Sequence, residues 1–302
     1  MHVSVIIGYM EYLYVVNRFY FKEKTDAIVD TLKKVSEEFH RNYEILVNDT
    51  VEDALKNKEL FQNSEYIVTA LGGDGSINRI LNHIVDTKNV LSYIPIGTGN
   101  DFYRGNLESL ENGIYDADLI RINDMYCINI ACFGIDADIA NDERFIHNRL
   151  IPESMRYNAA VVYHFLPYGG GHLKISCNGK DYDGDYTTVV VANSRYYGSG
   201  YKVSPFSRID DGVMEVYLVD RLNKIAMAKV ILSMKDAGHL TNPAVCSLQT
   251  EKLLIRADQP FSANIDGEVL TSDRFEIEIL PKKIRLEFDA DFIRKIREVK
   301  YS

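Results

Sequence analysis

The sequence has few cysteines and no paired cysteine spacing, and this removes two classes of protein. Its 302 residues include only Cys127, Cys132, Cys177 and Cys246, with no Cys-x-x-Cys pair and no histidine at zinc-finger spacing. A disulfide framework or a zinc finger is therefore not indicated. Three of the four cysteines lie in apolar or β-like runs, so we expect buried free thiols in a reducing compartment.

The signals of membrane-spanning and secreted proteins are also missing. No run approaches the ~20 apolar residues that a membrane span requires. The apolar stretch 3–7 is soon interrupted by Glu11 and Arg18, and it has neither a basic lead nor a small-residue cleavage site, so no signal peptide is expected. We predict a cytoplasmic protein, with peripheral contact at the inner face of a membrane left open.

Basic residues are outnumbered in this chain. The 34 Lys and Arg against 44 Asp and Glu give a net charge of -10. Nucleic-acid binding needs a basic face, so we predict no nucleic-acid partner. A hydrophobic content of 46% is ordinary for a globular protein, and a length of 302 residues favours two domains. The oligomeric state stays open, with a homodimer among the options.

The first 116 residues alternate β-rich runs with helical periodicity. This alternation predicts a parallel α/β sheet, whose ligands bind at the carboxyl ends of the strands. Thr25 or Asp26 is the expected cap of the first helix. The predicted strands span 12–17, 43–47, 66–71 and 91–96, and the predicted helices span 28–39, 49–61 and 76–86.

Two glycine-rich loops follow neighbouring predicted strands. The first is Gly72-Gly73-Asp74-Gly75, and the second runs from Gly97 to Asp101. Glycine lets the backbone approach a ligand, and a helix N-terminus offers amides to an anion. Either loop alone is most often a simple turn, but two at one sheet edge favour a phosphate site. The carboxylate of Asp74 suits a Mg-bound nucleotide or a substrate hydroxyl.

After about residue 116 the pattern becomes mostly antiparallel β, with short β-rich runs separated by turns. Asn178-Gly179 is a strong hairpin signal. Only 153–166 and 222–236 look helical, and the tail 289–299 has a weak helical pattern that could pack back on the first domain. We therefore predict a first domain of 1–116 plus about 288–302 and a second of 117–287. The β-rich runs are 126–133, 172–177, 187–192, 213–219, 252–255 and 275–279.

Five ordered motifs together resemble one known family, over about residues 12 to 280. They are Gly72–Ser76; Pro95–Phe102; Asn129–Ala131 with Gly134–Ala137; Asn193–Gly200 followed by Pro205 and Asp210–Gly212; and Asp266–Glu268. They resemble the catalytic domain of the diacylglycerol kinase family, in particular soluble bacterial lipid kinases related to sphingosine and ceramide kinases.

The resemblance implies a fold and an activity. The implied fold is an NAD-kinase or phosphofructokinase-like α/β nucleotide-binding domain followed by an antiparallel β-sandwich domain that receives the lipid, with the active site in the cleft between the two. The implied activity is ATP- and Mg-dependent phosphorylation of a lipid alcohol, with diacylglycerol to phosphatidic acid favoured. An NAD kinase shares the first glycine turn, but Asn100-Asp101 and the late Asp-Gly-Glu favour the lipid kinases.

The resemblance also implies roles for individual residues. Glu268 would be the general base, Asp74 would help to hold the catalytic Mg, and Asp211 would bind a second Mg with the backbone carbonyls of Arg208 and Val213. These roles suit phosphoryl transfer, which needs positioning, charge neutralisation and a carboxylate near the attacking hydroxyl. The implied ATP-binding residues are Asn17, Gly72, Gly73, Asp74, Gly75, Ser76, Asn78, Thr98 and Asn100.

One segment departs from the family pattern. Where the family has a proline and a glycine after Asn17, this chain has Arg18–Phe21. Bulky residues cannot copy a glycine loop, although Asn17 could cap the turn and Arg18 could reach a phosphate. A catalytically weak nucleotide- or lipid-binding protein therefore remains an alternative. The aromatic and basic residues of 18–24 either touch a membrane or pack, and we favour packing. The apolar and basic stretch 146–165 either faces a membrane or a lipid tail or packs in the core with a solvated basic face, and we favour packing.

Overall fold

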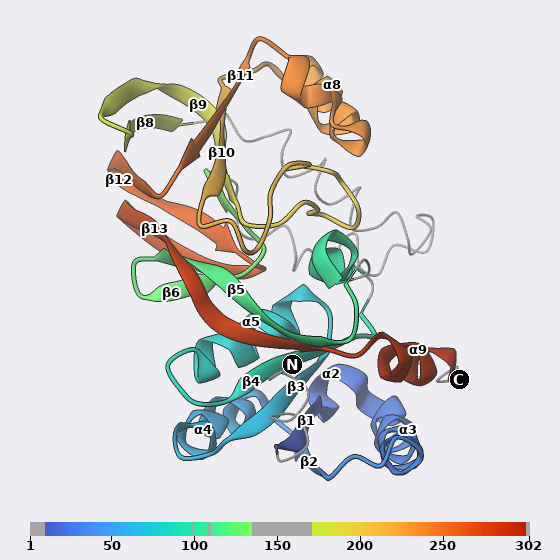
Figure 1. Cartoon of the computed structure of the whole chain (residues 1–302). Coiled ribbons are helices and arrows are strands. Elements are labelled where there is room, and N and C mark those ends of the chain that lie inside the picture. The colour runs from blue at the N-terminus through green and yellow to red at the C-terminus, as the bar shows by residue number, and fades with distance from the viewer. Residues whose placement is uncertain (1–9, 98, 108–109, 135–170, 300–302) are drawn as a thin grey trace. The chain divides into compact units, whose positions relative to one another are not determined.

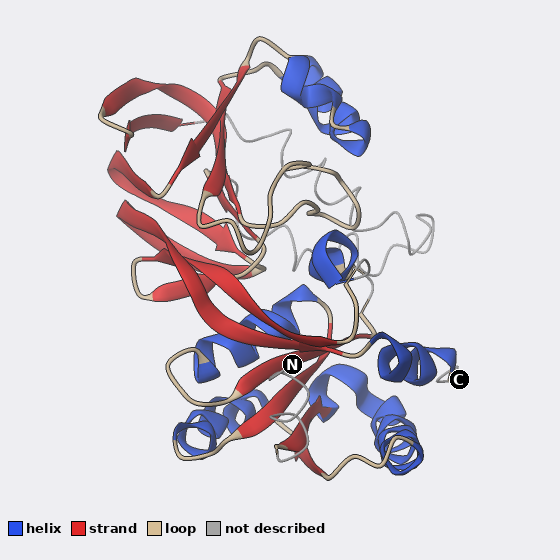
Figure 2. Cartoon of the chain, viewed as in Figure 1, coloured by secondary structure: helices blue, strands red, loops and turns tan. Residues whose placement is uncertain are grey.

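The computed structural model describes residues 10–97, 99–107, 110–134 and 171–299. Contacts divide the chain into two compact units. Unit 1 comprises Met1–Asn100, Leu107–Ala117 and Lys282–Ser302, and unit 2 comprises Asp101–Asn106 and Asp118–Pro281. Figure 1 colours the chain along its sequence, and Figure 2 shows that helices and strands alternate early while strands dominate later.

Unit 1 contains the predicted parallel sheet. Its strands are β1 (Glu11–Asn17), β2 (Tyr43–Asn48), β3 (Tyr66–Gly72) and β4 (Val90–Pro95), in the order β4-β3-β1-β2 and all parallel. The last part of β13 (Glu268–Phe288) runs parallel to β4. Every residue of β4 is buried, as expected for a strand covered on both faces. The four predicted strands are confirmed.

Helices cover this sheet through their apolar stripes. They are α3 (Thr25–Glu38), α4 (Val51–Gln62), α5 (Asp74–Ile84) and α9 (Ala290–Glu298). Figure 1 shows α4 and α5 on one side of the sheet, with α3 and α9 on the other. The predicted cap of α3 is wrong, because Lys24 is the N-cap residue and the Thr25 hydroxyl instead donates to the Lys22 carbonyl at 2.7 Å. Two short helices, α2 (Arg18–Phe21) and η1 (Lys22–Lys24), precede α3.

The C-terminal tail packs back on unit 1, which confirms the expectation for it. The ring of Phe292 in α9 stacks on Tyr14 of β1 at a centroid distance of 5.9 Å. Arg41 lies over the rings of both Tyr12 and Phe292, at 4.0 and 3.7 Å. Asp289 caps the helix by accepting from the Phe292 N–H at 3.0 Å.

Unit 2 is built from antiparallel strands, as predicted. Along the order β11-β10-β9-β7-β12-β13 each neighbour pairs antiparallel, and β8 joins β9 to β12. The Asn178-Gly179 hairpin is confirmed, with both residues at positive φ (51° and 72°) between paired Cys177 and Lys180. Two strands that the sequence did not indicate, β5 and β11, are present. The bounds are β5 Gly113–Ile122, β6 Met125–Cys127, β7 Ile130–Phe133, β8 Gly171–Cys177, β9 Lys180–Ala192, β10 Met214–Asp220, β11 Val245–Thr250 and β12 Lys252–Ile265.

Alternation along the strands of unit 2 makes two apolar clusters. On β9, Val189 and Val191 belong to one cluster, whereas Val190 and Ala192 belong to the other. The second cluster is closed by α8 (Lys224–Ser233), which confirms the helix expected there. The helix expected at 153–166 lies outside the described residues. The remaining short helices are η2 (Tyr103–Leu107), η4 (Met234–Asp236) and η5 (Gly238–Thr241).

The cysteines are free thiols, in line with the sequence. Cys127, Cys132 and Cys177 are buried, but Cys246 is exposed, so the expectation of burial is wrong for that residue. Cys246 lies on β11, which pairs only with β10 along the described strand order, and its side chain points outward there. In the described part of the chain, no helix is long and apolar enough to cross a membrane.

Candidate functional site

The first glycine loop links β3 to α5. Gly72 ends the strand with a φ of +142°, which L-residues with a side chain rarely adopt. Gly73 is the N-cap residue, and Asp74 and Gly75 begin α5. The N–H of Ser76 donates back to the Gly73 carbonyl at 3.0 Å, which closes the first helical turn. The turn therefore presents a helix N-terminus at the carboxyl end of a parallel strand, where anions bind.

The second glycine loop lies directly against the first. The N–H groups of Ile96 and Gly97 donate to the Gly72 carbonyl at 3.1 and 3.0 Å. A Cβ on Gly97 would lie 2.6 Å from the Cα and the N of Gly73, so only glycine fits there. The structure thus brings the two loops together backbone to backbone, and we call this pair, 72–76 with 97–100, the glycine cradle.

Tyr93 is a structural member of the cradle that sequence reasoning missed. Its hydroxyl lies 3.0 Å from the Gly72 carbonyl and 3.0 Å from Asn100 Oδ1, and its ring is fully buried in β4. Asn100, at a φ of +51°, also donates to the Gly97 carbonyl at 2.7 Å. The amide of Asn100 therefore holds the loop in shape. The only signal for Tyr93 was one phenol in an apolar strand.

Two other predicted ATP-binding residues, Ser76 and Asn78, lie in the first part of α5. A Cβ on Gly72 would meet Ser76 Oγ at 2.3 Å, so the serine hydroxyl lies over that glycine. Asn78 is 1% exposed, and both its carbonyl and its Oδ1 accept from Asn82 Nδ2, at 3.0 and 3.1 Å. The Ser76 side chain therefore packs over Gly72 of the cradle, and the Asn78 side chain is hydrogen-bonded within α5. Thr98 lies outside the described residues.

Asn17 lies at the carboxyl end of β1, in an amide chain that the sequence did not reveal. Asn48 Nδ2 donates to Asn17 Oδ1 at 2.9 Å, and Asn57 Nδ2 donates to Asn48 Oδ1 at 3.2 Å. These bonds fix which end of the Asn17 amide is the acceptor, so its NH2 group remains as the donor for a ligand. Asn17 makes no side-chain cap to α2, so the expected capping role is wrong.

The segment that departs from the family pattern forms α2. Arg18 Nη1 and Nε pair with Asp26 and Asp49 at 3.1 and 2.8 Å. No residue of α2 is buried, and Tyr20 is 52% exposed with its ring against Phe21. The expected packing of this aromatic cluster is therefore wrong for Tyr20. Two carboxylates already hold the guanidinium of Arg18 that sequence reasoning offered to a phosphate.

In unit 2, Glu268 begins β13 directly after a two-residue hairpin. Asp266 and Gly267 adopt φ values of +50° and +99° between the paired residues Ile265 and Glu268. Asp-Gly at two positive φ positions is the favoured sequence for this kind of turn. The half-buried Glu268 is therefore presented at a tight corner, where a carboxylate can meet a substrate hydroxyl.

The predicted metal loop gathers negative charge. Asp211 Oδ1 accepts from the Val213 N–H at 3.2 Å, and Asp118 Oδ2 accepts from the Gly212 N–H at 2.7 Å. Burial raises the pKa of Asp211, and the neighbouring charges of Asp118 and Asp210 raise it further. A bound cation would relieve this repulsion, so the residues fit a hard ion.

Few of the described side chains around Asp211 could serve as further metal ligands. Arg208 places its guanidinium on Asp210 at 3.1 Å, so only its backbone carbonyl is offered to a metal. In the part of the chain that the structure describes, no three His, Cys, Asp or Glu side chains are grouped to hold a metal. A cation at Asp211 would therefore take carbonyls and water as its other ligands, which suits Mg. Sequence reasoning missed Asp118, one of two acids in β5, a strand that the sequence did not indicate.

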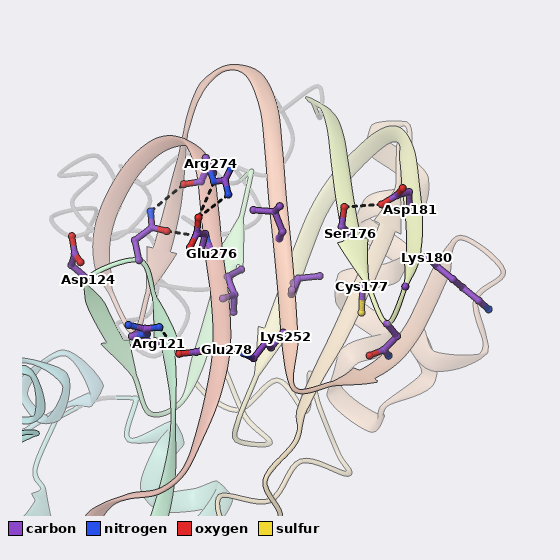
Figure 3. Close-up of a pocket in the computed structure, with 16 residues that line it drawn as sticks. Arg121, Asp124, Ser176, Cys177, Lys180, Asp181, Lys252, Arg274, Glu276 and Glu278 are labelled. Atoms are coloured by element: carbon purple, nitrogen blue, oxygen red, sulfur yellow. Dashed lines mark hydrogen bonds and ion pairs between the residues drawn. The ribbon is translucent and has the colours of Figure 1, made fainter.

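A separate cavity in unit 2 contains none of the predicted site residues. It has a volume of about 860 Å³ and is bordered by the end of β5 and the turn after it, the β8–β9 hairpin, β12 and β13 (Figure 3). Several of its charges are paired, as in Lys252 with Glu278 at 3.4 Å and Arg274 with Glu276 at 2.8 Å, and Ser176 donates to Asp181.

Comparisons with known families divide the chain as its fold does. Residues 11–120 match the diacylglycerol kinase catalytic domain. Residues 129–288 match the YegS C-terminal NAD kinase beta sandwich-like domain, which accounts for more than half of the chain. The chain thus has a catalytic α/β domain and a β-sandwich-like domain, which confirms the predicted fold class.

Individual relatives agree with these matches. A protein of Shewanella frigidimarina named "Probable lipid kinase YegS-like" is 27% identical over 71% of this chain and 74% of its own. "Probable lipid kinase YegS" of Salmonella heidelberg is 25% identical over 74% and 78%. The crystal structure of a diacylglycerol kinase from Bacillus anthracis superposes with a TM-score of 0.67 at 18% identity, covering 93% of this chain and 98% of that one. The last likeness supports the fold.

Proposed function

We propose, on the premise that this chain belongs to the YegS-like family of lipid kinases, that it transfers the terminal phosphoryl group of ATP to a lipid alcohol. Diacylglycerol is the proposed acceptor, with phosphatidic acid as the product, because similar folds include a diacylglycerol kinase. The proposal includes a dependence on Mg.

The glycine cradle carries this proposal. Two N–H···O bonds of 3.1 and 3.0 Å join the two loops, and a side chain larger than glycine at Gly97 would force them apart because its Cβ would lie 2.6 Å from the Gly73 backbone. A backbone packed this closely leaves the helix N-terminus of α5 accessible to a phosphate without intervening side chains. Gly72, Gly73, Gly75 and Ser76 would line the phosphates, and the Asn17 NH2 group would donate at the neighbouring strand end.

Glu268 would complete the reaction from its turn. The lipid hydroxyl oxygen attacks the terminal phosphorus, the bond from that phosphorus to the ADP oxygen breaks, and the hydroxyl proton moves to the Glu268 carboxylate. Mg, when bound, would neutralise phosphate charge, with Asp74 at the cradle and Asp211 at its own loop as carboxylate ligands. The backbone carbonyls of Arg208 and Val213 would assist Asp211.

The acceptor also sets the proposed surroundings of the enzyme. Diacylglycerol stays in a bilayer because its apolar tails are insoluble, so the kinase would work in the cytoplasm in peripheral contact with a membrane surface. A lipid-presenting vesicle or mixed micelle is therefore the right form of substrate for a test.

A transfer assay tests the function. The full chain is incubated with labelled ATP and Mg against diacylglycerol, a sphingoid base, an isoprenoid alcohol and, as a control, NAD. We expect label in phosphatidic acid. Label in NAD alone would establish the NAD kinase alternative, and tight ATP binding without transfer to any acceptor would establish the weakly catalytic one.

Mg dependence has its own test at Asp211. We expect millimolar Mg to raise the thermal midpoint of the wild-type protein and to leave that of Asp211→Asn unchanged, because the variant loses the charged ligand. Asp210→Asn is the matched control, since Asp210 is paired with Arg208 and should keep the Mg response. An equal Mg response in all three proteins would exclude a metal at Asp211. Differential scanning fluorimetry gives the midpoints.

A further inference from the structure

A buried carboxylate lies two residues before Glu268. Asp266 is 3% exposed, and its oxygens accept from three successive backbone N–H groups. Oδ2 accepts from Ile128 at 2.7 Å, and Oδ1 accepts from Asn129 and Ile130 at 3.1 and 2.9 Å. These donors are 136 to 138 positions away in the sequence. Backbone amides arranged in this way stabilise the ionised form of a buried carboxylate.

The cysteine beside these amides supplies a further donor. Cys127 Sγ donates to Asp266 Oδ1 at 3.2 Å. Burial and, after it, the charge of Asp266 raise the pKa of Cys127 well above its ordinary value. The same two causes raise the pKa of Cys132 to about 12. Both thiols therefore stay protonated at neutral pH, and Cys127 remains a donor to the carboxylate.

The turn is also held from its other side. The Asp266 N–H donates to the Ile130 carbonyl at 3.2 Å. Asn264 Oδ1 accepts from the Gly267 N–H at 3.0 Å and from the Tyr197 hydroxyl at 3.1 Å. Two residues at positive φ would be mobile in an open loop, but here every backbone N–H between Ile265 and Glu268 has a fixed partner.

We propose that Asp266 is a positioning residue, whose buried carboxylate fixes the turn that presents Glu268 through the amides of 128–130. The proposal rests on the proposed function, since it requires Glu268 to be the base. A positional error of about 1 Å in a catalytic group can cost about 100-fold in rate. A hairpin tip that carries a base therefore benefits from an anchor that does not depend on the substrate.

Asp266→Asn is the main test, because the amide keeps the shape and the preference for positive φ while replacing one acceptor oxygen by a donor. That NH2 group would face N–H donors. We expect kcat to fall about 100-fold while KM for ATP stays within about twofold, since the ATP site lies in unit 1. Asp273→Asn, an exposed acid on the same strand, is the control and should match the wild type.

A double-mutant cycle separates positioning from general structure. If Asp266 acts through Glu268, then Asp266→Asn combined with Glu268→Gln should be no slower than Glu268→Gln alone, measured in single turnovers with excess enzyme. Losses that multiply would overturn the positioning role. A wild-type rate in Asp266→Asn with an inactive Glu268→Gln would also overturn it, while the proposed function would stand.

A second variant keeps the test valid if Asp266→Asn does not fold. Asn264→Ala leaves the carboxylate and its amides intact but frees the Gly267 N–H, so kcat should fall about fivefold through the loss of one hydrogen bond that holds the turn, with a native circular dichroism spectrum. An unchanged kcat in Asn264→Ala would show that the rigidity of the turn does not matter, and the proposal would fail.

Discussion

The glycine cradle and the Glu268 turn are built in opposite ways. In the cradle the contacts are made by main-chain atoms, because Gly72, Gly73 and Gly97 have no side chains to keep the two loops apart. In the turn the contacts are made by a side chain, because the carboxylate of Asp266 accepts hydrogen bonds from the main chain of a segment that is distant in the sequence. The cradle joins residues about 25 positions apart, whereas the turn joins residues 136 or more positions apart.

This contrast follows from what each site must provide. A phosphate needs several N–H groups at close range, and glycine alone lets the backbone come near enough. A general base needs one carboxylate at a fixed distance, so its support must be rigid and its side chain must extend. Breaking each kind of support should therefore lower a different kinetic constant.

The largest expected effect belongs to the turn. Glu268→Gln removes the proposed proton acceptor and keeps the shape, so we expect kcat to fall by about 10³-fold, within the range for a general base. ATP affinity, followed by calorimetry, should not change, because the cradle is untouched. Normal turnover by this variant would contradict the assignment of Glu268.

The next effect belongs to the cradle. Gly97→Ala would put a methyl group 2.6 Å from the backbone of Gly73, and the backbone cannot yield without separating the loops. We expect ATP affinity to fall about 100-fold, with a lower melting temperature. Gly75→Ala is the control for stability, because its Cβ would meet nothing within 4 Å and alanine favours the helix. Equal melting temperatures for the two variants would show that the loops do not need close contact.

A smaller effect is expected at the neighbouring strand end. Asn48→Ala removes the donor that orients the Asn17 amide, and one such hydrogen bond contributes about 1 kcal/mol. KM for ATP should rise by about fivefold to tenfold with little change in kcat. If KM does not move, the Asn17 NH2 group does not contact the nucleotide. Steady-state kinetics at saturating lipid would decide.

The smallest effect is expected at the segment that departs from the family pattern. Arg18 is half-exposed and already paired with Asp26 and Asp49, and such surface pairs contribute less than about 1 kcal/mol. Arg18→Ala should therefore change KM for ATP by less than about threefold. A tenfold rise would show that this arginine leaves its carboxylates for a phosphate. Kinetic measurements at two salt concentrations would separate these cases.

Local patterns predicted most of the fold. Four parallel strands, the helices between them and the Asn178-Gly179 hairpin follow from periodicity and turn residues that interact over short distances. The strands β5 and β11 were missed because their residues alternate weakly. The sequence predicts Thr25 or Asp26 as the cap of α3, but the preceding short helix moves the N-cap to Lys24.

The candidate site likewise contains residues that the sequence predicted and residues that only the structure revealed. The two glycine loops could be predicted from the sequence, because two such loops after neighbouring parallel strands favour a phosphate site, although one alone is most often a simple turn. Tyr93, Asn48 and Asp118 could not, because each lies in a strand without a motif around it, and its partner is identified only once the chain is folded. The exposure of Cys246 depended in the same way on which strand lies at an edge.

The sequence by itself determined where the main chain turns and which residues can carry charge, because φ preferences and periodicity act between neighbours. Only the tertiary structure decided what holds those charges. Asp74 lies in a turn that its own neighbours build, while the turn before Glu268 holds a buried carboxylate whose amide donors come from the link between β6 and β7 and from the first residue of β7. The physical reason is that a buried charge must be solvated by whatever dipoles the fold brings to it, and no local pattern specifies those dipoles.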